Sequence, residues 1–416
     1  MTNQLDRVGR FLRSPRFPIF MIMFVDVLGV GITIPVLPLF AKTDLGAAAW
    51  QVTTLTSVYF VAQFFAAPWL GRLSDRVGRR PVLILSQAGT LAALIITGLA
   101  PSIVILYLAR IVDGLTGGNI SVAQAYLSDI TDEKNRARGL GVVNAAFGLG
   151  FIFGPAFGGI MAARFGPRVP FFAAAVVSLC TVLLSTFLLP ESLPPERRKR
   201  ETEAAAQGEH RHGLELIAAP AVGVLLAVAF LSQFSFFGFQ TIYVLWSQKL
   251  VFPTLPRDTF QEVIGAILTF VGVVGIVTQF WLVGPLVRRF GEKRLVLFGN
   301  LSRLIAFATF ALTASAVATI GVIPLLAGGG GVALPATIAL LTYAAPPGER
   351  GHMVGLYQSA AALGSVAGPI LSGYLFEQVN PNAPMVAAAI LMALTVAFAV
   401  SVQFMKVESP QHAAAH

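Results

Sequence analysis

The sequence predicts an all-α integral membrane protein with twelve transmembrane helices arranged as two six-helix halves. Of its 416 residues, 56% are hydrophobic and only 12% are charged, whereas a soluble domain carries about 25% charged residues. A chain this apolar cannot bury its surface in a water-soluble fold, so we expect the bilayer to be its solvent. Two further observations support this fold class, namely the positions of the basic residues and an internal repeat.

Twelve apolar runs have about the 20 residues that a helix needs to cross a bilayer. They lie near residues 17–41, 51–70, 81–100, 102–128, 139–163, 168–189, 217–247, 258–284, 295–314, 317–344, 353–376 and 383–405. The first run contains Asp26, Pro35 and Pro38 and has no small-residue cleavage site, so we expect a retained helix rather than a signal peptide. An even number of spans places both termini on one side.

The basic residues set the orientation of these spans. Of the 29 Lys and Arg residues, 22 fall in the termini and loops of one side, 5 on the other side and 2 inside spans. Because positively charged loops stay in the cytoplasm, this predicts a multi-pass protein of the inner or plasma membrane with both termini cytoplasmic. The net charge of +9 then comes from the basic loops that orient the chain in the membrane, and no nucleic-acid partner is expected.

The two halves repeat one another. A polar, proline-rich segment, 190–216, is predicted to be a cytoplasmic linker between an N-terminal half (1–189) and a C-terminal half (217–405), with a cytoplasmic tail over 406–416. The ten residues from Gly71 align with the ten from Gly284, 213 positions later, and Gly154-Pro155 recurs as Gly368-Pro369 after 214. Equivalent halves are typical of transporters that rock about a site between their repeats.

Four charged residues lie inside predicted spans: Asp26, Arg110, Asp113 and Arg303. A charge at the centre of a span costs at least about 2.5–3.5 kcal/mol, so each is a candidate functional residue. Arg110 and Asp113 are three positions apart and therefore share a helix face. We expect Asp26, Asp113 and Arg110 to couple the protein to protons; the alternative is a static ion pair that only fixes helix packing.

Four local patterns, in chain order, carry a family resemblance. They are Asp26-Val-Leu-Gly-Val-Gly-Ile-Thr-Ile-Pro-Val-Leu-Pro38, Gly71-Arg-Leu-Ser-Asp-Arg-Val-Gly-Arg-Arg80, Tyr107-Leu-Ala-Arg-Ile-Val-Asp-Gly-Leu-Thr-Gly-Gly118 and Gly148-Leu-Gly-Phe-Ile-Phe-Gly-Pro-Ala-Phe-Gly-Gly159. Together they resemble the drug/proton antiporters of the major facilitator superfamily, especially the tetracycline efflux branch. The resemblance implies the major facilitator fold. It also implies an antiporter motif in the fifth helix at Gly148, Gly150, Gly154, Pro155, Gly158 and Gly159.

The resemblance further implies a cytoplasmic latch in the loop that follows the second helix. Its residues would be Gly71, Asp75, Arg76, Gly78, Arg79, Arg80, Arg136 and Arg138. Asp75 would pair with basic residues and with the positive N-terminus of the eleventh helix. The second copy has Arg288 in place of Asp75, so we expect an asymmetric latch. The alternative for the arginines is a role in topology alone.

The chain departs from the tetracycline pumps at two places. Arg303 stands where those pumps carry an acid, and Gly275 lies near the place of their helix-8 histidine. Both departures argue against tetracycline itself as the substrate. A cationic Arg303 facing a cavity would favour anionic or zwitterionic amphiphiles; alternatively its side chain snorkels to the cytoplasmic surface.

Polar and aromatic residues that interrupt apolar helices are candidates for a substrate cavity. They are Tyr59, Gln63, Asn119, Asn144, Gln233, Phe236, Gln240, Arg303 and Gln358. For the aromatic side chains, packing or contact with lipid is the alternative. Membrane lipids and an apolar ligand are therefore the expected partners.

These observations predict a monomeric, proton-coupled exporter of hydrophobic or amphiphilic small molecules that works by alternating access. No Walker A loop is present, so we expect a proton gradient rather than ATP to supply the energy, with no cofactor and no metal. No histidine falls in a predicted span and Cys180 has no charged neighbour there, so no catalytic residues and no enzyme activity are expected. The alternative is a lipid or glycolipid flippase on the same fold.

Overall fold

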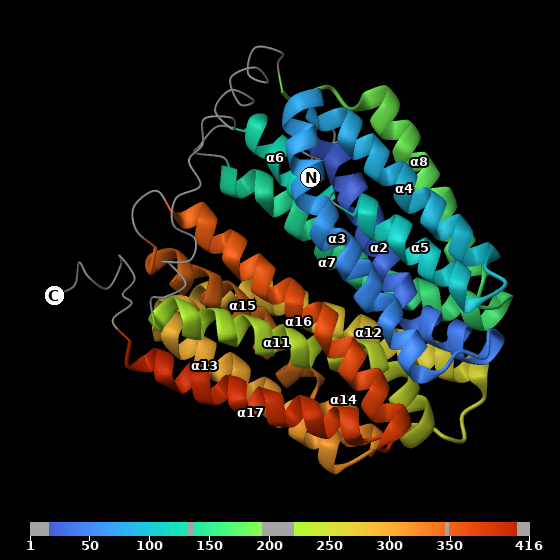
Figure 1. Ribbon diagram of the computed structural model, residues 1–416, viewed down its shortest axis with the longest axis vertical. Coiled ribbons are helices and arrows are strands. Elements are labelled where there is room, and N and C mark those ends of the chain that lie inside the picture. The colour runs from blue at the N-terminus through green and yellow to red at the C-terminus, as the bar shows by residue number, and fades with distance from the viewer. Residues whose placement is uncertain (1–15, 118, 132–135, 194–219, 346–348, 406–416) are drawn as a thin grey trace, which may run out of the picture. The chain divides into compact units, whose positions relative to one another are not determined.

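A computed structural model describes residues 16–117, 119–131, 136–193, 220–345 and 349–405. Every regular element in these ranges is a helix (Figure 1). The predicted helical membrane fold is therefore confirmed.

The elements before the linker follow the predicted spans closely. They are α2 (Arg16–Leu39), a π-helical turn η1 (Phe40–Asp44), α3 (Ala49–Val77), α4 (Arg79–Leu99), α5 (Ile103–Thr116), α6 (Asn119–Asp129), α7 (Arg136–Phe165) and α8 (Val169–Leu188).

The elements after the linker repeat this order. They are α11 (Pro220–Trp246), η3 (Ser247–Val251), α12 (Arg257–Val277), η4 (Thr278–Leu282), α13 (Val283–Leu312), α14 (Ala316–Gly321), α15 (Ile323–Tyr343), α16 (Arg350–Gln378) and α17 (Ala383–Gln403).

The helices are consistent with twelve membrane crossings. Ten segments of the described chain are long and apolar enough to cross a membrane. One of them, Arg257–Leu312, has 56 residues and is long enough for two crossings at about 20 residues each. The 29-residue α3 is not among the ten, because polar residues such as Gln51, Thr53 and Gln63 lower the hydropathy of its span.

Two predicted spans are interrupted. The span predicted over 102–128 divides into α5 and α6 around Gly117, and the span over 317–344 divides into α14 and α15 at Val322. Each still forms one candidate membrane span, Ile103–Asp129 and Ala316–Tyr343, and the break is an addition that length and hydropathy do not reveal.

The helices form two compact units, which are described separately. In the described chain, the first unit contains residues 16–40, 58–193 and 257–269, and the second contains 41–57, 220–256 and 270–405. The first nine residues of α3 thus belong to the second unit, where Ser57 Oγ donates a hydrogen bond of 2.7 Å to the Val366 carbonyl. The division at the linker, into 1–189 and 217–405, stays a prediction.

Close packing of α2 on α7 forms the centre of the first unit. A Cβ atom built on Gly154 would lie only 2.7 Å from the Gly31 Cα, and one on Gly150 would lie 2.7 Å from the Val27 Cβ. Small residues let the two backbones approach, as in membrane helix pairs generally. The fifth-helix pattern therefore has a structural role in this unit.

The other residues of this pattern also lie in or against tight contacts. A Cβ on Gly158 would meet Ile32, one on Gly159 would lie 2.5 Å from the Gln261 carbonyl, and Pro155 contacts Gly31. Gly148 is half-buried in α7.

Two glycines at equivalent places of the repeat turn the chain between helices. Gly78, between α3 and α4, has φ 111°, and Gly291, inside α13, has φ 73°. They are 213 positions apart, and this backbone conformation is strained for residues with a side chain. We call the segments around Gly78 and Gly291 the first joint and the second joint.

Replacing Gly154 with alanine should destabilise the protein, because the added methyl group has no room beside Gly31. We expect the free energy of unfolding to fall by about 1–3 kcal/mol, as for other overpacked cores, and thermal denaturation in detergent would show it. Gly141→Ala, on the same helix α7, is the matched control because nothing lies within 4 Å of its Cβ position. Equal melting temperatures for the two variants would contradict the packing argument.

Candidate functional site

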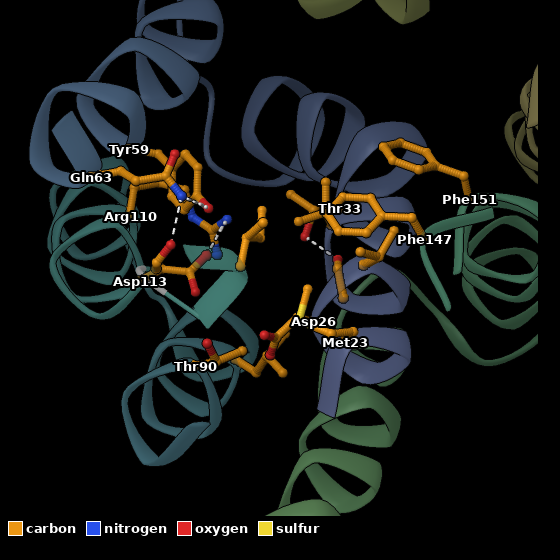
Figure 2. A pocket seen from close by; sticks show the side chains of 16 residues that line it. Met23, Asp26, Thr33, Tyr59, Gln63, Thr90, Arg110, Asp113, Phe147 and Phe151 are labelled. Atoms are coloured by element: carbon orange, nitrogen blue, oxygen red, sulfur yellow. Dashed lines mark hydrogen bonds and ion pairs between the residues drawn. The ribbon is translucent and has the colours of Figure 1, made fainter. Parts of the chain in front are cut away.

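A cavity of about 90 Å³ lies inside the first unit (Figure 2). Residues of α2, α3, α4, α5, α6 and α7 line it, together with Gly117 between α5 and α6. Its polar lining residues are Asp26, Thr33, Tyr59, Gln63, Thr90, Arg110 and Asp113. A buried water needs roughly 10–15 Å³ of such volume and several polar partners, so the cavity can hold a small water cluster.

Arg110 and Asp113 form an ion pair on one side of this cavity. The Arg110 Nη1 atom lies 3.2 Å from Asp113 Oδ2, and the two side chains are only 8% and 15% exposed. A second amino group of Arg110 donates to Thr97 Oγ1 at 3.3 Å. The predicted pairing along one helix face is confirmed, in a setting largely removed from solvent.

Asp26 enters the same cavity from α2. Figure 2 shows it facing the space between its own helix and the Arg110–Asp113 pair. Met23, Phe147 and Phe151 supply apolar walls beside it. The structure therefore brings together the three residues that were predicted to couple transport to protons, from two different helices.

The break between α5 and α6 borders this cavity. In an unbroken helix the Gly117 carbonyl would accept a hydrogen bond from the N–H group four residues later. Here the Gln63 amide nitrogen of α3 donates to it instead, at 2.7 Å, and also lies 3.1 Å from the Tyr59 hydroxyl oxygen. An unpaired carbonyl inside a membrane is costly, so Gln63 stabilises the broken form of the helix.

Three other carbonyls near the end of α5 also accept hydrogen bonds from groups close by. Thr116 Oγ1 donates to the carbonyls of Val112 at 2.8 Å and Asp113 at 3.3 Å, and the Gly117 N–H donates to the Gly114 carbonyl at 3.1 Å. These contacts pair backbone groups at a helix end that lies one turn beyond the Asp113 side chain.

The sequence gives only a weak signal for this break, because the glycine pair at 117 and 118 is also tolerated within unbroken membrane helices.

Arg79 holds the first joint through two carboxylates. Its Nη1 atom pairs with Asp75 and donates to Ser74 Oγ at 2.7 Å, and its Nε lies 3.3 Å from Asp129 Oδ2. The Arg79 side chain is only 8% exposed. Asp129, at the end of α6, was not among the predicted site residues.

A second carboxylate that the sequence interpretation missed caps α4. Glu191 Oε1 accepts a hydrogen bond of 2.9 Å from the Arg79 N–H, and Oε2 accepts one of 3.3 Å from the Arg80 N–H. The Arg80 side chain donates to the Thr186 carbonyl. A carboxylate at a helix N-terminus is favourable because it pairs free N–H groups and faces the positive end of the helix dipole.

The second joint has different contacts at equivalent positions. At the 213-residue offset Arg79 corresponds to Glu292, whose Oε1 accepts a hydrogen bond of 3.2 Å from the Tyr343 hydroxyl. Lys293 Nζ donates to the Met405 carbonyl at 2.5 Å. The two joints share a backbone turn but differ in chemistry.

Comparison with known proteins agrees with this arrangement. The Major Facilitator Superfamily model matches residues 19–255 and 241–415. The chain belongs to the Major Facilitator Superfamily. It is 33% identical to the class C tetracycline resistance protein of Escherichia coli, over 83% of this chain and 86% of that protein.

Two further likenesses concern a relative in sequence and a solved structure with the same fold. It is 31% identical to multidrug resistance protein 2 of Bacillus subtilis, strain 168, over 89% of this chain and 90% of that protein. The crystal structure of the nucleoside transporter NupG superposes with a TM-score of 0.74 at 14% identity, covering 95% of this chain and 100% of that one. The predicted resemblance to the tetracycline efflux branch is confirmed, and the chain is a multi-pass membrane transporter protein.

The predicted cavity residues fall into three groups in this superfamily member. Tyr59 and Gln63 line the described cavity. The side chains of Asn119 and Asn144 lie outside the described residues. The remaining candidates belong to the second unit and do not line this cavity: Gln233, Phe236, Gln240, Arg303 and Gln358. For them a place in a substrate cavity stays a prediction.

Only some of the predicted latch residues lie together at the first joint. Asp75, Gly78, Arg79 and Arg80 meet in the first joint, as described above. Arg76 is exposed, and nothing lies within 4 Å of a Cβ built on Gly71. The side chains of Arg136 and Arg138 lie outside the described residues, and the pairing of Asp75 with the eleventh helix stays a prediction.

Replacing Arg79 with glutamine should destabilise the protein, because the variant leaves Asp129 and Asp75 without their cation. Removing one member of a buried ion pair typically costs about 3–5 kcal/mol, and the partial exposure of Asp75 (41%) places the expected loss at the lower end. Thermal denaturation of the purified protein would measure it. Arg76→Gln, on the exposed face, should melt like the wild type; a similar loss in both variants would refute the role assigned to Arg79.

Replacing Gln63 with methionine should loosen the break between α5 and α6. Methionine keeps the length of the side chain but cannot donate to the Gly117 carbonyl, and an unsatisfied buried group costs about 1–3 kcal/mol. We expect faster hydrogen–deuterium exchange in peptides that cover residues 112–125. Gln87→Met is the control, because Gln87 is also a buried glutamine of the first unit but bonds Ser185. Unchanged exchange in the Gln63 variant would show that the amide does not maintain the break.

Proposed function

We propose that this protein is a proton-coupled exporter of hydrophobic or amphiphilic small molecules that works by alternating access in the inner or plasma membrane, with both termini cytoplasmic. The observation that carries the proposal is the common cavity of Asp26, Arg110 and Asp113 in the first unit. The tetracycline and multidrug resistance proteins among its relatives support efflux of drug-like compounds.

The charges of the cavity explain how protons would be used. Two carboxylates and one guanidinium face one small volume, so the cavity carries one negative charge when all three are ionised. Arg110 is paired with Asp113 at 3.2 Å, and a proton on either carboxylate makes the set neutral. Burying net charge in a membrane is costly. The helices around these three side chains would therefore favour one packing arrangement when the proton is bound and another when it is not.

Alternating access would use this difference. The water that the cavity can hold would bring a proton to the carboxylates from one side of the membrane. Neutralisation would favour one conformation, and release to the other side would favour the return. A substrate that binds only one conformation would then move against the proton flow.

Proton flux in proteoliposomes tests this proposal. The purified protein would be reconstituted with a pH-sensitive dye inside, and ethidium, tetracycline and apolar carboxylic acids would be added under an imposed pH gradient. We expect at least one compound to evoke proton flux, and Asp26→Asn and Asp113→Asn to abolish most of that flux, because each variant removes an ionisable carboxylate from the cavity. Asp44→Asn is the control, because Asp44 lies in η1 and does not line the cavity.

Two results would contradict the proposal. Full substrate-evoked flux in both aspartate variants would remove the coupling role of these residues. If no compound moves protons while fluorescent lipids exchange between leaflets, lipid flipping is the better description of the protein.

A further inference from the structure

Arg303 of the second unit is a buried cation without a carboxylate. Arg303 is only 4% exposed, and it lies well inside the long helix α13. Within the described chain no ion pair to its guanidinium is found. It therefore does not snorkel to the surface, and a buried, unpaired charge in a membrane helix points to a function.

Neutral groups hold the Arg303 side chain in place. Its Nη1 atom donates to Ser232 Oγ and its Nη2 to the Ser232 carbonyl at 3.1 Å. The guanidinium carbon lies 5.4 Å from the ring centre of Phe236 and 6.0 Å from that of Phe307. Aromatic faces stabilise a cation, but none of these groups neutralises its charge.

The Nε donor of Arg303 has no partner among the described residues, and it lies close to glycine backbone. This Nε atom is buried. A Cβ built on Gly330 would lie 4.0 Å from this Nε and 3.9 Å from the Arg303 Cδ. Gly330 is half-buried and belongs to four consecutive glycines, 328–331. The surface of α15 beside the free donor therefore carries no side chain.

The internal repeat places Arg303 at a position that faces a cavity in the other half. At the 213-residue offset that relates Gly78 to Gly291, Arg303 corresponds to Thr90. Thr90 lines the cavity of the first unit. Because the equivalent residue of the first unit lines a cavity, the position of Arg303 is consistent with contact to a ligand.

We propose that Arg303 and the bare surface of Gly330 form a subsite for the carboxylate or similar oxyanion of an amphiphilic substrate, with Phe236 beside its apolar part. An oxyanion would accept a hydrogen bond from Nε and neutralise the guanidinium. This inference deepens the proposed function, on which it rests, by naming the substrate class. The same chemistry occurs in free amphiphilic acids and in the headgroups of anionic lipids.

Equilibrium binding of matched acid and amide pairs tests the subsite. The full chain, purified in detergent, would be titrated with radiolabelled naphthaleneacetic acid, an aliphatic and a biaryl carboxylic acid, and the primary amide of each. We expect at least one acid to bind about tenfold or more tightly than its amide, the usual size of a hydrogen bond to a charged group. Arg303→Gln should abolish this preference, and Arg303→Lys should retain part of it.

Two variants separate the subsite from general effects on the fold. Gly330→Leu keeps the charge of Arg303 but fills the space beside Nε, so it should weaken binding of the acid and spare the amide. Gly330→Ala should bind like the wild type, because its methyl group makes only ordinary contacts. Arg168→Gln is the matched control: Arg168 also lies over a ring, 5.1 Å from the centre of Phe40, and donates to backbone carbonyls, but in the first unit.

The outcomes distinguish this inference from the proposed function. Binding is measured without a gradient, so a failure of proton coupling leaves it untouched. If compounds evoke proton flux but acids and amides bind alike in the wild type and in Arg303→Gln, the subsite is refuted and antiport stands. Arg303-dependent flipping of fluorescent phosphatidylglycerol but not phosphatidylcholine, without binding of free acids, would assign the oxyanion to a lipid. If neither acids nor phosphatidylglycerol depend on Arg303, the inference fails.

Discussion

The absence of water from the bilayer core is the constraint on which this structure depends. Each polar group inside the membrane must find its partner within the protein. The Gly117 carbonyl finds it in the Gln63 amide and Arg110 finds it in Asp113. Where helices meet without polar partners, glycines such as Gly31 and Gly154 bring the backbones into contact. Arg303 differs from Arg110 in its charge: both leave a buried Nε without a hydrogen-bond partner, but the partners of Arg303 among the described residues are all neutral.

The two units pair their buried polar and charged groups in different ways. The first gathers two acids and one arginine around a cavity and closes its joint with ion pairs. The second keeps the same turn at Gly291 but replaces the ion pairs with a tyrosine hydroxyl and a backbone carbonyl, and it buries a lone cation. The candidate proton-coupling residues thus lie in one unit, and the proposed oxyanion subsite lies in the other.

Much of this could be predicted from the sequence. Helix positions follow from hydropathy because a membrane helix has to be apolar over its whole length. The residues proposed for proton coupling stand out in the sequence because charges such as Asp26 and Asp113 are energetically costly in an apolar run. The partners of Arg79 could not be predicted, since Asp129 and Glu191 lie 50 and 112 positions away in the chain. The Gly117 carbonyl at the break pairs with Gln63 of another helix, a contact that no local sequence pattern reveals.

The chemistry of the two joints has a consequence for the conditions under which the protein is studied. Mobile ions screen charges over about 8 Å at physiological ionic strength and about 3 Å in molar salt. The partly exposed Asp75–Arg79 pair of the first joint is sensitive to this screening, whereas the hydrogen bonds described at the second joint are much less so. The salt concentration of a purification buffer therefore acts mainly on the first joint, so stabilities measured in buffers of different ionic strength differ chiefly through the contacts of that joint.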